Sequence, residues 1–135
     1  MERLYRTPDD LKTINRRLFE KVVAEIFHKL GFEVELTRQT RDGGKDIIAI
    51  SRRPFGLRFL IECKRPNPGN PVRVAAVREL LFVKGKENAT KGILVTTTRF
   101  TADARILAEQ HLWELELRAF DDVTSWVADH VRCTG

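Results

Sequence analysis

The chain has 135 residues, of which 42% are hydrophobic and 32% are charged, a balance that excludes an intrinsically disordered protein and suits one domain over residues 1–135. No run approaches the roughly 20 apolar residues of a membrane span, and the two cysteines lack the spacing of a disulfide framework or a zinc site, so we expect a cytoplasmic protein without membrane contact. Lysine and arginine number 24 against 19 acidic residues, and the net charge of +5 favours a polyanionic partner such as nucleic acid.

The first predicted element is a long helix that begins at Thr7-Pro8-Asp9-Asp10 and ends at Gly31. Threonine is a good cap, proline fits the first helical turn, and acidic side chains suit the positive end of the helix dipole. Apolar residues between Phe19 and Leu30 recur at three-and-four spacing, which is typical of an amphipathic helix. A glycine directly after this pattern is a common helix end.

Strands alternate with helices over the rest of the chain. Three short segments are joined by short polar connections, which favours an antiparallel meander. A strand–helix–strand unit follows, whose two strands are expected to be parallel. The predicted elements are strands 33–37, 46–50 and 57–62, a helix 72–86, a strand 92–97, a helix 101–111, a strand 114–120 and a helix 121–131. The order αβββαβ with a C-terminal αβα extension predicts an α/β fold with a mixed central sheet flanked by helices.

Three ionisable groups, Asp46, Glu62 and Lys64, lie at the ends of two neighbouring predicted strands. Side chains alternate along a strand, so Glu62 and Lys64 point to one face and Cys63 to the other. Because the two strands are expected to pair through the turn at 53–56, Asp46 at the start of one lies beside the end of the next. The sequence therefore predicts two carboxylates and an ammonium group at one edge of the sheet.

This set of groups suits the hydrolysis of a phosphodiester. Carboxylate oxygens bind hard cations such as Mg²⁺, with Mn²⁺ as an expected substitute, and the metal polarises the phosphoryl group and acidifies bound water. Lys64 is expected to orient or deprotonate the attacking water, or to stabilise the transition state. Glu20 lies at the border of the apolar helix face, from which it can bind the metal directly or through water. The alternative interpretation is that these residues cap turns and form solvated surface pairs.

Several motifs follow one another in a characteristic order. They are Phe19-Glu20-x-x-Val-Ala-x-x-Phe27, Leu30-Gly31-Phe32, Asp42-Gly43-Gly44-Lys45-Asp46, Glu62-Cys63-Lys64 and Gly92-Ile93-Leu94-Val95-Thr96-Thr97. Together they closely resemble the catalytic domain of the Mrr-type restriction endonucleases, in the PD-(D/E)xK nuclease superfamily. The resemblance runs from about Arg17 to Phe120, and its most specific part is the spacing of sixteen residues from Asp46 to Glu62.

The resemblance implies a restriction-endonuclease-like fold, a divalent metal and DNA as substrate. By position in the motifs, Asp46 and Glu62 are expected to bind the metal, Lys64 to be the catalytic lysine, and Glu20 to be a further catalytic and metal-binding residue. Lys45 stands where the nominal family motif has proline. Many family members carry a separate DNA-binding domain. We expect none within residues 1–135, so we expect any sequence specificity to come from a separate specificity or partner protein.

The residues that follow Lys64 are candidates for contacts with the DNA backbone. Arg65, Asn67, Arg73 and Arg78 are expected near the scissile phosphate, where they would give salt-sensitive and sequence-independent binding. We favour Arg78 among them, because it stands beside the inward-facing position 77. The alternative is that all four lie on the solvated surface.

These observations predict a Mg²⁺-dependent DNA endonuclease that acts in restriction, defence or DNA processing. One alternative is a structure-specific nuclease that resolves DNA junctions, in the manner of Holliday-junction resolvases. Another is a non-catalytic nucleic-acid-binding subunit of a larger complex, against which the intact set Asp46, Glu62 and Lys64 argues.

Leu11, Ile14 and Leu18 lie on a different face of the first predicted helix from its main apolar stripe. We therefore expect the helix to bend near Asn15 or to cover a second surface. This stripe is one candidate surface for a homodimer, because two copies of one active site are the simplest means of cutting two DNA strands.

Overall fold

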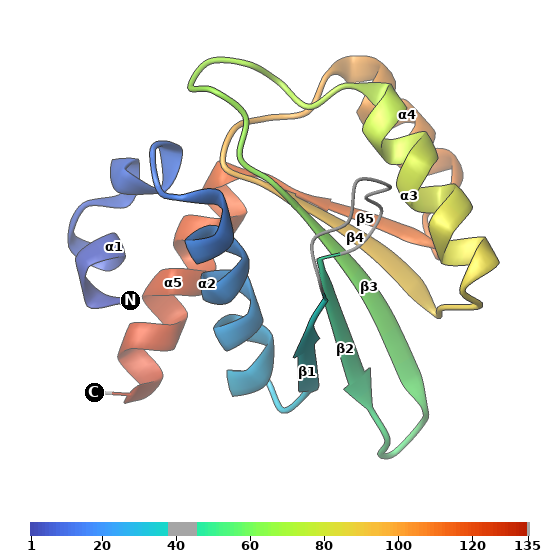
Figure 1. Cartoon of the computed structure of the whole chain (residues 1–135), viewed down its shortest axis with the longest axis horizontal. Helices are drawn as coiled ribbons and strands as arrows, with labels where there is room; N and C mark the ends of the chain where they lie inside the picture. Colours follow the sequence, from blue (N-terminus) through green and yellow to red (C-terminus); the bar gives the residue numbers. More distant parts are fainter. Residues whose placement is uncertain (38–45, 135) are drawn as a thin grey trace.

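The computed structural model describes residues 1–37 and 46–134, and a five-stranded sheet lies at its centre with helices on both faces (Figure 1). The strands are β1 (Glu33–Leu36), β2 (Ile47–Ser51), β3 (Leu57–Lys64), β4 (Lys91–Thr96) and β5 (Leu115–Arg118). The helices are α1 (Glu2–Arg6), the 3₁₀ helix η1 (Pro8–Lys12), α2 (Arg16–Lys29), α3 (Val74–Lys86), α4 (Ala102–Gln110) and α5 (Phe120–Thr134). The predicted order αβββαβ with an αβα extension is confirmed from α2 to α5, and α1 is an additional element that was not predicted.

The strands lie in the sheet in the same order as in the sequence, from β1 to β5. β2 is antiparallel to both β1 and β3, whereas β4 is parallel to β3 and to β5. Short connections leave neighbouring strands antiparallel, and the crossovers through α3 and α4 bring the chain back to the same edge. The prediction of a mixed sheet is confirmed. As a result, the start of β2 and the end of β3 lie at the same edge of the sheet.

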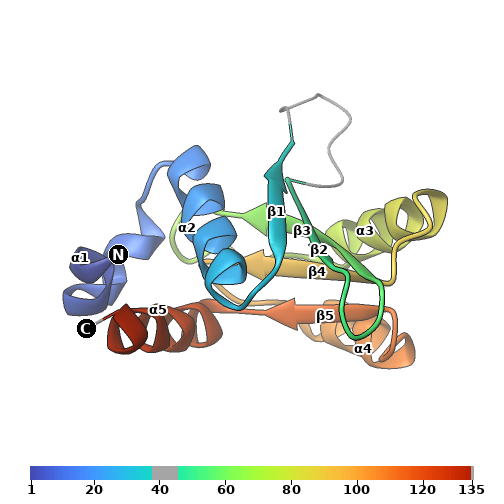
Figure 2. The same ribbon diagram turned by 90° about the horizontal axis from the view of Figure 1, so that it is seen from below.

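Two apolar cores lie on opposite faces of the sheet, one under α2 and α5 and the other under α3 and α4; Figure 2 shows these two pairs of helices. The core under α2 and α5 contains fully buried side chains from both helices and from β2 and β3, including Phe19, Val23, Ile47, Ile61 and Val123. The core under α3 and α4 includes Val77, Leu80, Leu94 and Leu115. Side chains alternate along β3, so Ile61 belongs to the core under α2 and α5, whereas Glu62 points to the face that α3 and α4 cover.

The N-terminal region corrects the prediction of one long helix. The Thr7 side chain forms no capping hydrogen bond, and the segment that follows it is the short 3₁₀ helix η1. Asn15 instead caps α2, because its side-chain oxygen accepts from the main-chain N of Arg17 at 2.9 Å and of Leu18 at 3.2 Å. The change of direction predicted near Asn15 is thus a break between two helices.

This break separates the three residues of the proposed dimer stripe. Leu11 is 0% exposed and belongs to the core with Leu4, Ile14 is partly buried against it, and Leu18 is 50% exposed. Leu11 is therefore not available for contact with a second copy.

Within the described ranges, none of the helices is long and apolar enough to cross a membrane.

Candidate active site

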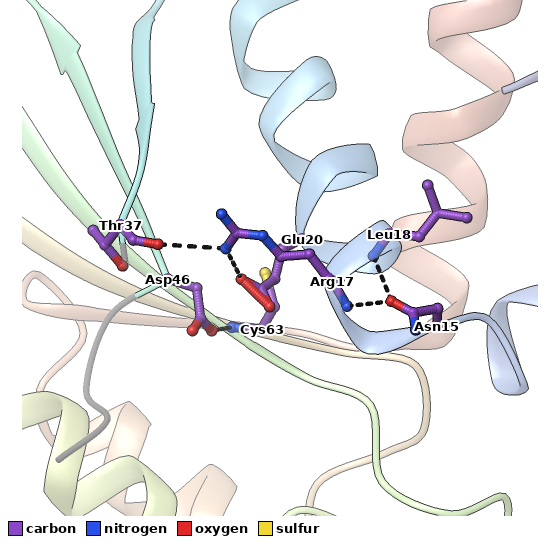
Figure 3. Close-up of polar contacts among 7 residues, drawn as sticks. All are labelled: Asn15, Arg17, Leu18, Glu20, Thr37, Asp46 and Cys63. Atoms are coloured by element: carbon purple, nitrogen blue, oxygen red, sulfur yellow. Dashed lines mark hydrogen bonds and ion pairs between the residues drawn. The ribbon is translucent and has the colours of Figure 1, made fainter. Parts of the chain in front are cut away.

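The pairing of β2 with β3 positions Asp46 beside Glu62. The main-chain N of Asp46 donates to Ile61 O at 2.8 Å, one step before the pair Ile47–Ile61 in the ladder. The carboxylate of Asp46 turns towards β3, and its Oδ2 accepts the main-chain N–H of Cys63 at 2.7 Å (Figure 3). Asp46 is therefore held both by its main chain and by its side chain.

Glu62 and Lys64 lie on the same face of β3, as strand alternation predicts. Lys64 Nζ lies 3.0 Å from Glu62 Oε1. Glu62 is 3% exposed, and its second oxygen, Oε2, is buried without a hydrogen-bond donor among the described residues. A buried carboxylate oxygen without a partner is costly. The ion pair with Lys64 uses only Oε1 and gives Oε2 no partner. A hard cation held by Glu62 and the neighbouring Asp46 would supply that partner.

Glu20 reaches this region from α2, which covers the face of the sheet opposite to α3. It is 4% exposed, and its Oε1 accepts from Arg17 Nη1 at 2.8 Å (Figure 3). The same Arg17 nitrogen donates to the main-chain O of Thr37 at 3.3 Å. The structure thus places Glu20 near Asp46, in line with its predicted place at the border of the apolar helix face.

Glu20, Asp46 and Lys64 line an open groove of about 610 Å³, whereas Glu62 is buried behind Lys64 and is not among its lining residues. Its charged lining residues are Arg16, Glu20, Asp46, Lys64, Arg65, Arg73 and Glu79. Two of the predicted DNA-binding residues, Arg65 and Arg73, thus face the groove. Asn67 and Arg78 are exposed outside it. Arg78 points away because successive helical residues are rotated by about 100°, and Val77 and Leu80 are the residues of α3 that face the sheet.

Sequence reasoning missed three charged residues around the groove: Arg16, Arg17 and Glu79. Ala76 and Glu79 both line the groove from α3. Their spacing of three residues, which places them on the same face of a helix, was the signal for Glu79. For Arg16 and Arg17, the signal was Asn15, a strong capping residue that places both in the first turn of α2.

Burial and neighbouring charges shift the acidity of the central groups. Burial raises the pKa of Asp46, although the Cys63 N–H and the Lys64 and Arg17 charges lower it. Burial also raises the pKa of Glu62, against the lowering effect of Lys64. Burial by itself lowers the pKa of Lys64, but Glu62, Glu79 and Asp46 together raise it above its ordinary value. Lys64 is therefore held in its ammonium form at neutral pH.

The candidate metal ligands form a pair of carboxylates and not a complete cage. Over residues 1–37 and 46–134, no group of three or more His, Cys, Asp or Glu side chains is arranged to hold a metal ion. Mg²⁺ commonly binds through one or two carboxylates and keeps several waters, so Asp46 and Glu62 suit it. Residues 42–45 of the Asp-Gly-Gly-Lys-Asp motif lie outside the described residues.

Comparison with known proteins identifies the family. The family model for the Mrr catalytic domain, a restriction endonuclease, matches residues 11–127. The chain belongs to this family. It is also similar to the uncharacterized protein y4cE of Sinorhizobium fredii (strain NBRC 101917 / NGR234), with 37% identity over 100 residues, which cover 73% of this chain and 26% of that protein.

The Mrr-type chain has the fold of restriction endonucleases of known structure. The DNA modification-dependent restriction endonuclease AspBHI matches with a TM-score of 0.69 and 23% identity, over 96% of this chain and 33% of that one. The MspJI restriction endonuclease, in complex with a 27-mer oligonucleotide, matches with a TM-score of 0.63 and 22% identity, over 93% of this chain and 30% of that one. The chain thus has the PD-(D/E)xK fold, belongs to a family of nucleases, and spans about a quarter to a third of these relatives.

Proposed function

We propose that this Mrr-type domain is a metal-dependent DNA endonuclease, with Asp46 and Glu62 as metal ligands and Lys64 as the catalytic lysine. One observation carries the proposal. Glu62 binds Lys64 through one oxygen and leaves the other buried and without a donor among the described residues, beside the carboxylate of Asp46. Asp46 and Glu62 would hold a divalent cation, whose charge would compensate that of the two carboxylates.

The residues of the site have distinct roles in this proposal. A bound Mg²⁺ supplies Lewis-acid polarisation of the phosphoryl group and a more acidic water. Lys64, held as an ammonium group by Glu62, stabilises the negative charge that develops on the phosphoryl oxygens. Glu20 would bind the metal directly or through water from the lining of the groove, with its Oε1 held by Arg17. The Cys63 N–H keeps the Asp46 carboxylate turned towards β3.

Removal of the metal is expected to abolish cleavage. Supercoiled plasmid incubated with the protein should be nicked or linearised in Mg²⁺ or Mn²⁺ and left intact in excess chelator, with activity restored when Mg²⁺ is added back. Because AspBHI is a DNA modification-dependent enzyme, modified DNA should be included, together with a four-way junction. Cleavage at the same rate in chelator would contradict the metal dependence. Binding without cleavage of every substrate would favour the non-catalytic alternative.

The two walls of the groove are proposed to hold the DNA backbone. Arg16 lies at the start of α2, whereas Arg65 follows β3 and Arg73 precedes α3, so basic groups from three parts of the chain line the groove together with Glu20 and Asp46. Such contacts depend on phosphate charge and not on base sequence. Selection of a particular DNA is therefore proposed to require further parts of a longer protein or a separate partner.

Arg73 and Arg78 form a matched pair that tests this surface. Arg73→Ala should weaken DNA binding severalfold and lower the slope of log K against log salt by about 1, as expected for one lost phosphate contact. Arg78→Ala removes the same charge from the exposed face outside the groove, and its effect should be smaller. Fluorescence anisotropy with a labelled duplex at several salt concentrations measures both. Equal losses in the two variants would place the DNA elsewhere.

A homodimer is the proposed means of cutting both strands. One monomer carries one site, so a monomer should accumulate nicked plasmid before linear product appears. Sedimentation of the protein with and without duplex DNA distinguishes the two states.

A further inference from the structure

Arg17 connects two parts of the chain next to the groove. A single nitrogen, Nη1, donates to Glu20 Oε1 at 2.8 Å and to the main-chain O of Thr37 at 3.3 Å (Figure 3). Glu20 belongs to α2, and Thr37 directly follows β1. One guanidinium group therefore ties the first turns of the helix to the end of the edge strand.

The connection continues from Thr37 to Asp46 through the main chain. The N–H of Thr37 donates to Asp46 O at 2.9 Å, and the N–H of Asp46 donates in turn to Ile61 O at 2.8 Å. The Asp46 carboxylate then accepts the Cys63 N–H at 2.7 Å. A continuous series of hydrogen bonds thus runs from Arg17 to the carboxylate that is proposed to bind the metal.

The start of α2 directs Arg17 towards these acceptors. Asn15 caps the helix and binds the main-chain N–H of Arg17 at 2.9 Å, which fixes the first turn. Arg17 and Glu20 are three residues apart, so their side chains lie on the same side of the helix. Arg17 keeps a 38% exposed side chain while that of Glu20 is 5% exposed. Among the described residues that line the groove, Arg16 and Glu20 are present and Arg17 is not.

We propose that Arg17 is a positioning residue for metal binding: it holds Glu20 directly, and Asp46 through Thr37, in the arrangement that accepts the cation. The proposal rests on the proposed function of Asp46 and Glu20. The planar guanidinium group suits this task, because the two N–H bonds of Nη1 have a fixed geometry and can serve a carboxylate and a carbonyl at once.

The test compares Arg17→Met and Arg17→Lys with the control variant Arg52→Met. Arg52 forms an ion pair of 3.2 Å with Glu33 at the opposite end of β1, and both side chains are largely exposed. The control therefore removes an arginine that is paired with β1 at its other end and does not line the groove. Titration calorimetry with Mn²⁺ in the absence of DNA measures the metal affinity of each full chain. Hydrogen exchange of the Thr37 amide, in chelator, measures the connection to Asp46 directly.

Arg17→Met should bind Mn²⁺ about 10–100-fold more weakly, the usual range when a group that orients a metal ligand is lost. Its Thr37 amide should exchange faster than in the wild type. Arg17→Lys should recover part of the affinity, because an ammonium group can still donate to Glu20. Arg52→Met should stay within about twofold of the wild type in both measurements. In plasmid cleavage, Arg17→Met should lower kcat and leave KM for DNA nearly unchanged.

Two results would overturn the proposal. The first is Mn²⁺ affinity and Thr37 exchange in Arg17→Met that match those of the wild type. The second is a rise in KM with unchanged Mn²⁺ affinity, which would make Arg17 a DNA contact. These outcomes differ from failure of the proposed function itself. In that case the wild-type chain would bind no Mn²⁺ and cleave no DNA, and a metal-positioning role for Arg17 would fall with it.

Discussion

Lys64→Ala is expected to lower the rate of DNA cleavage by about 10²–10³-fold, the usual loss when one group that stabilises transition-state charge is removed. Lys64 Nζ lies 3.0 Å from Glu62 Oε1 at the edge of the groove, and neighbouring carboxylates keep it protonated. The substitution removes the positive charge that is proposed to stabilise the phosphoryl group, and it leaves Glu62 without its ion-pair partner. Initial rates on supercoiled plasmid in Mg²⁺ measure the effect.

Lys86→Ala is the matched control for this variant. Lys86 is the last residue of α3 and is exposed, whereas the groove lies at the first turns of that helix. A helix of 13 residues is about 20 Å long, so the control removes a lysine of the same domain far from the groove. Lys64→Arg is the informative intermediate, because it keeps the charge and changes the geometry. A Lys64→Ala chain that folds normally and cleaves within threefold of the wild type would exclude Lys64 from catalysis.

Glu62→Gln is expected to abolish cleavage and, at the same time, to stabilise the metal-free protein at neutral pH. Loss of activity follows from loss of a proposed metal ligand. The gain in stability follows from the buried position of Glu62, which makes its ionised form unfavourable without a metal. Glutamine has nearly the same shape and can still accept a hydrogen bond from Lys64. We expect the free energy of unfolding to rise by about 0.5–2 kcal/mol, the usual range for a single stabilising substitution.

The pH dependence gives this prediction a definite sign. The pKa of Glu62 is raised by burial in the folded protein, so the folded state takes up this proton more readily than the unfolded state. The stabilising contribution of protonated Glu62 is complete at low pH, below the ordinary glutamate range, and is lost as the pH rises through the raised value. The advantage of Glu62→Gln should therefore be greatest near pH 8 and should shrink towards pH 4.

Urea unfolding in chelator at both pH values measures the difference in the free energy of unfolding. Glu33→Gln is the control, because Glu33 forms an exposed ion pair with Arg52 and surface pairs contribute little. Its effect should stay within about 0.5 kcal/mol. A Glu62→Gln chain that is less stable than the wild type at pH 8 would show that the ion pair with Lys64 outweighs the cost of burying the carboxylate.

Much of this protein was predictable because the relevant physics is local. Strand alternation placed Glu62 and Lys64 on one face, and the short turn after β2 placed Asp46 beside them. The length of the connections determined which strands would be antiparallel and which parallel. The family resemblance drawn from the same motifs is confirmed by the match over residues 11–127. These features depend on neighbours in the sequence or on one hairpin.

Other features depend on contacts between distant segments, which only the tertiary structure decided. A capping threonine at position 7 and an asparagine at position 15 both mark helix starts, and the packing of Leu11 in the core selects the second as the start of α2. Arg78 was favoured for DNA contact, yet the side of α3 that faces the sheet leaves it outside the groove. The bridge from Arg17 to Thr37 spans 20 residues, and no local pattern reveals it. Composition and spacing determined which chemical groups meet at the sheet edge, whereas long-range packing decided which residues surround and hold them.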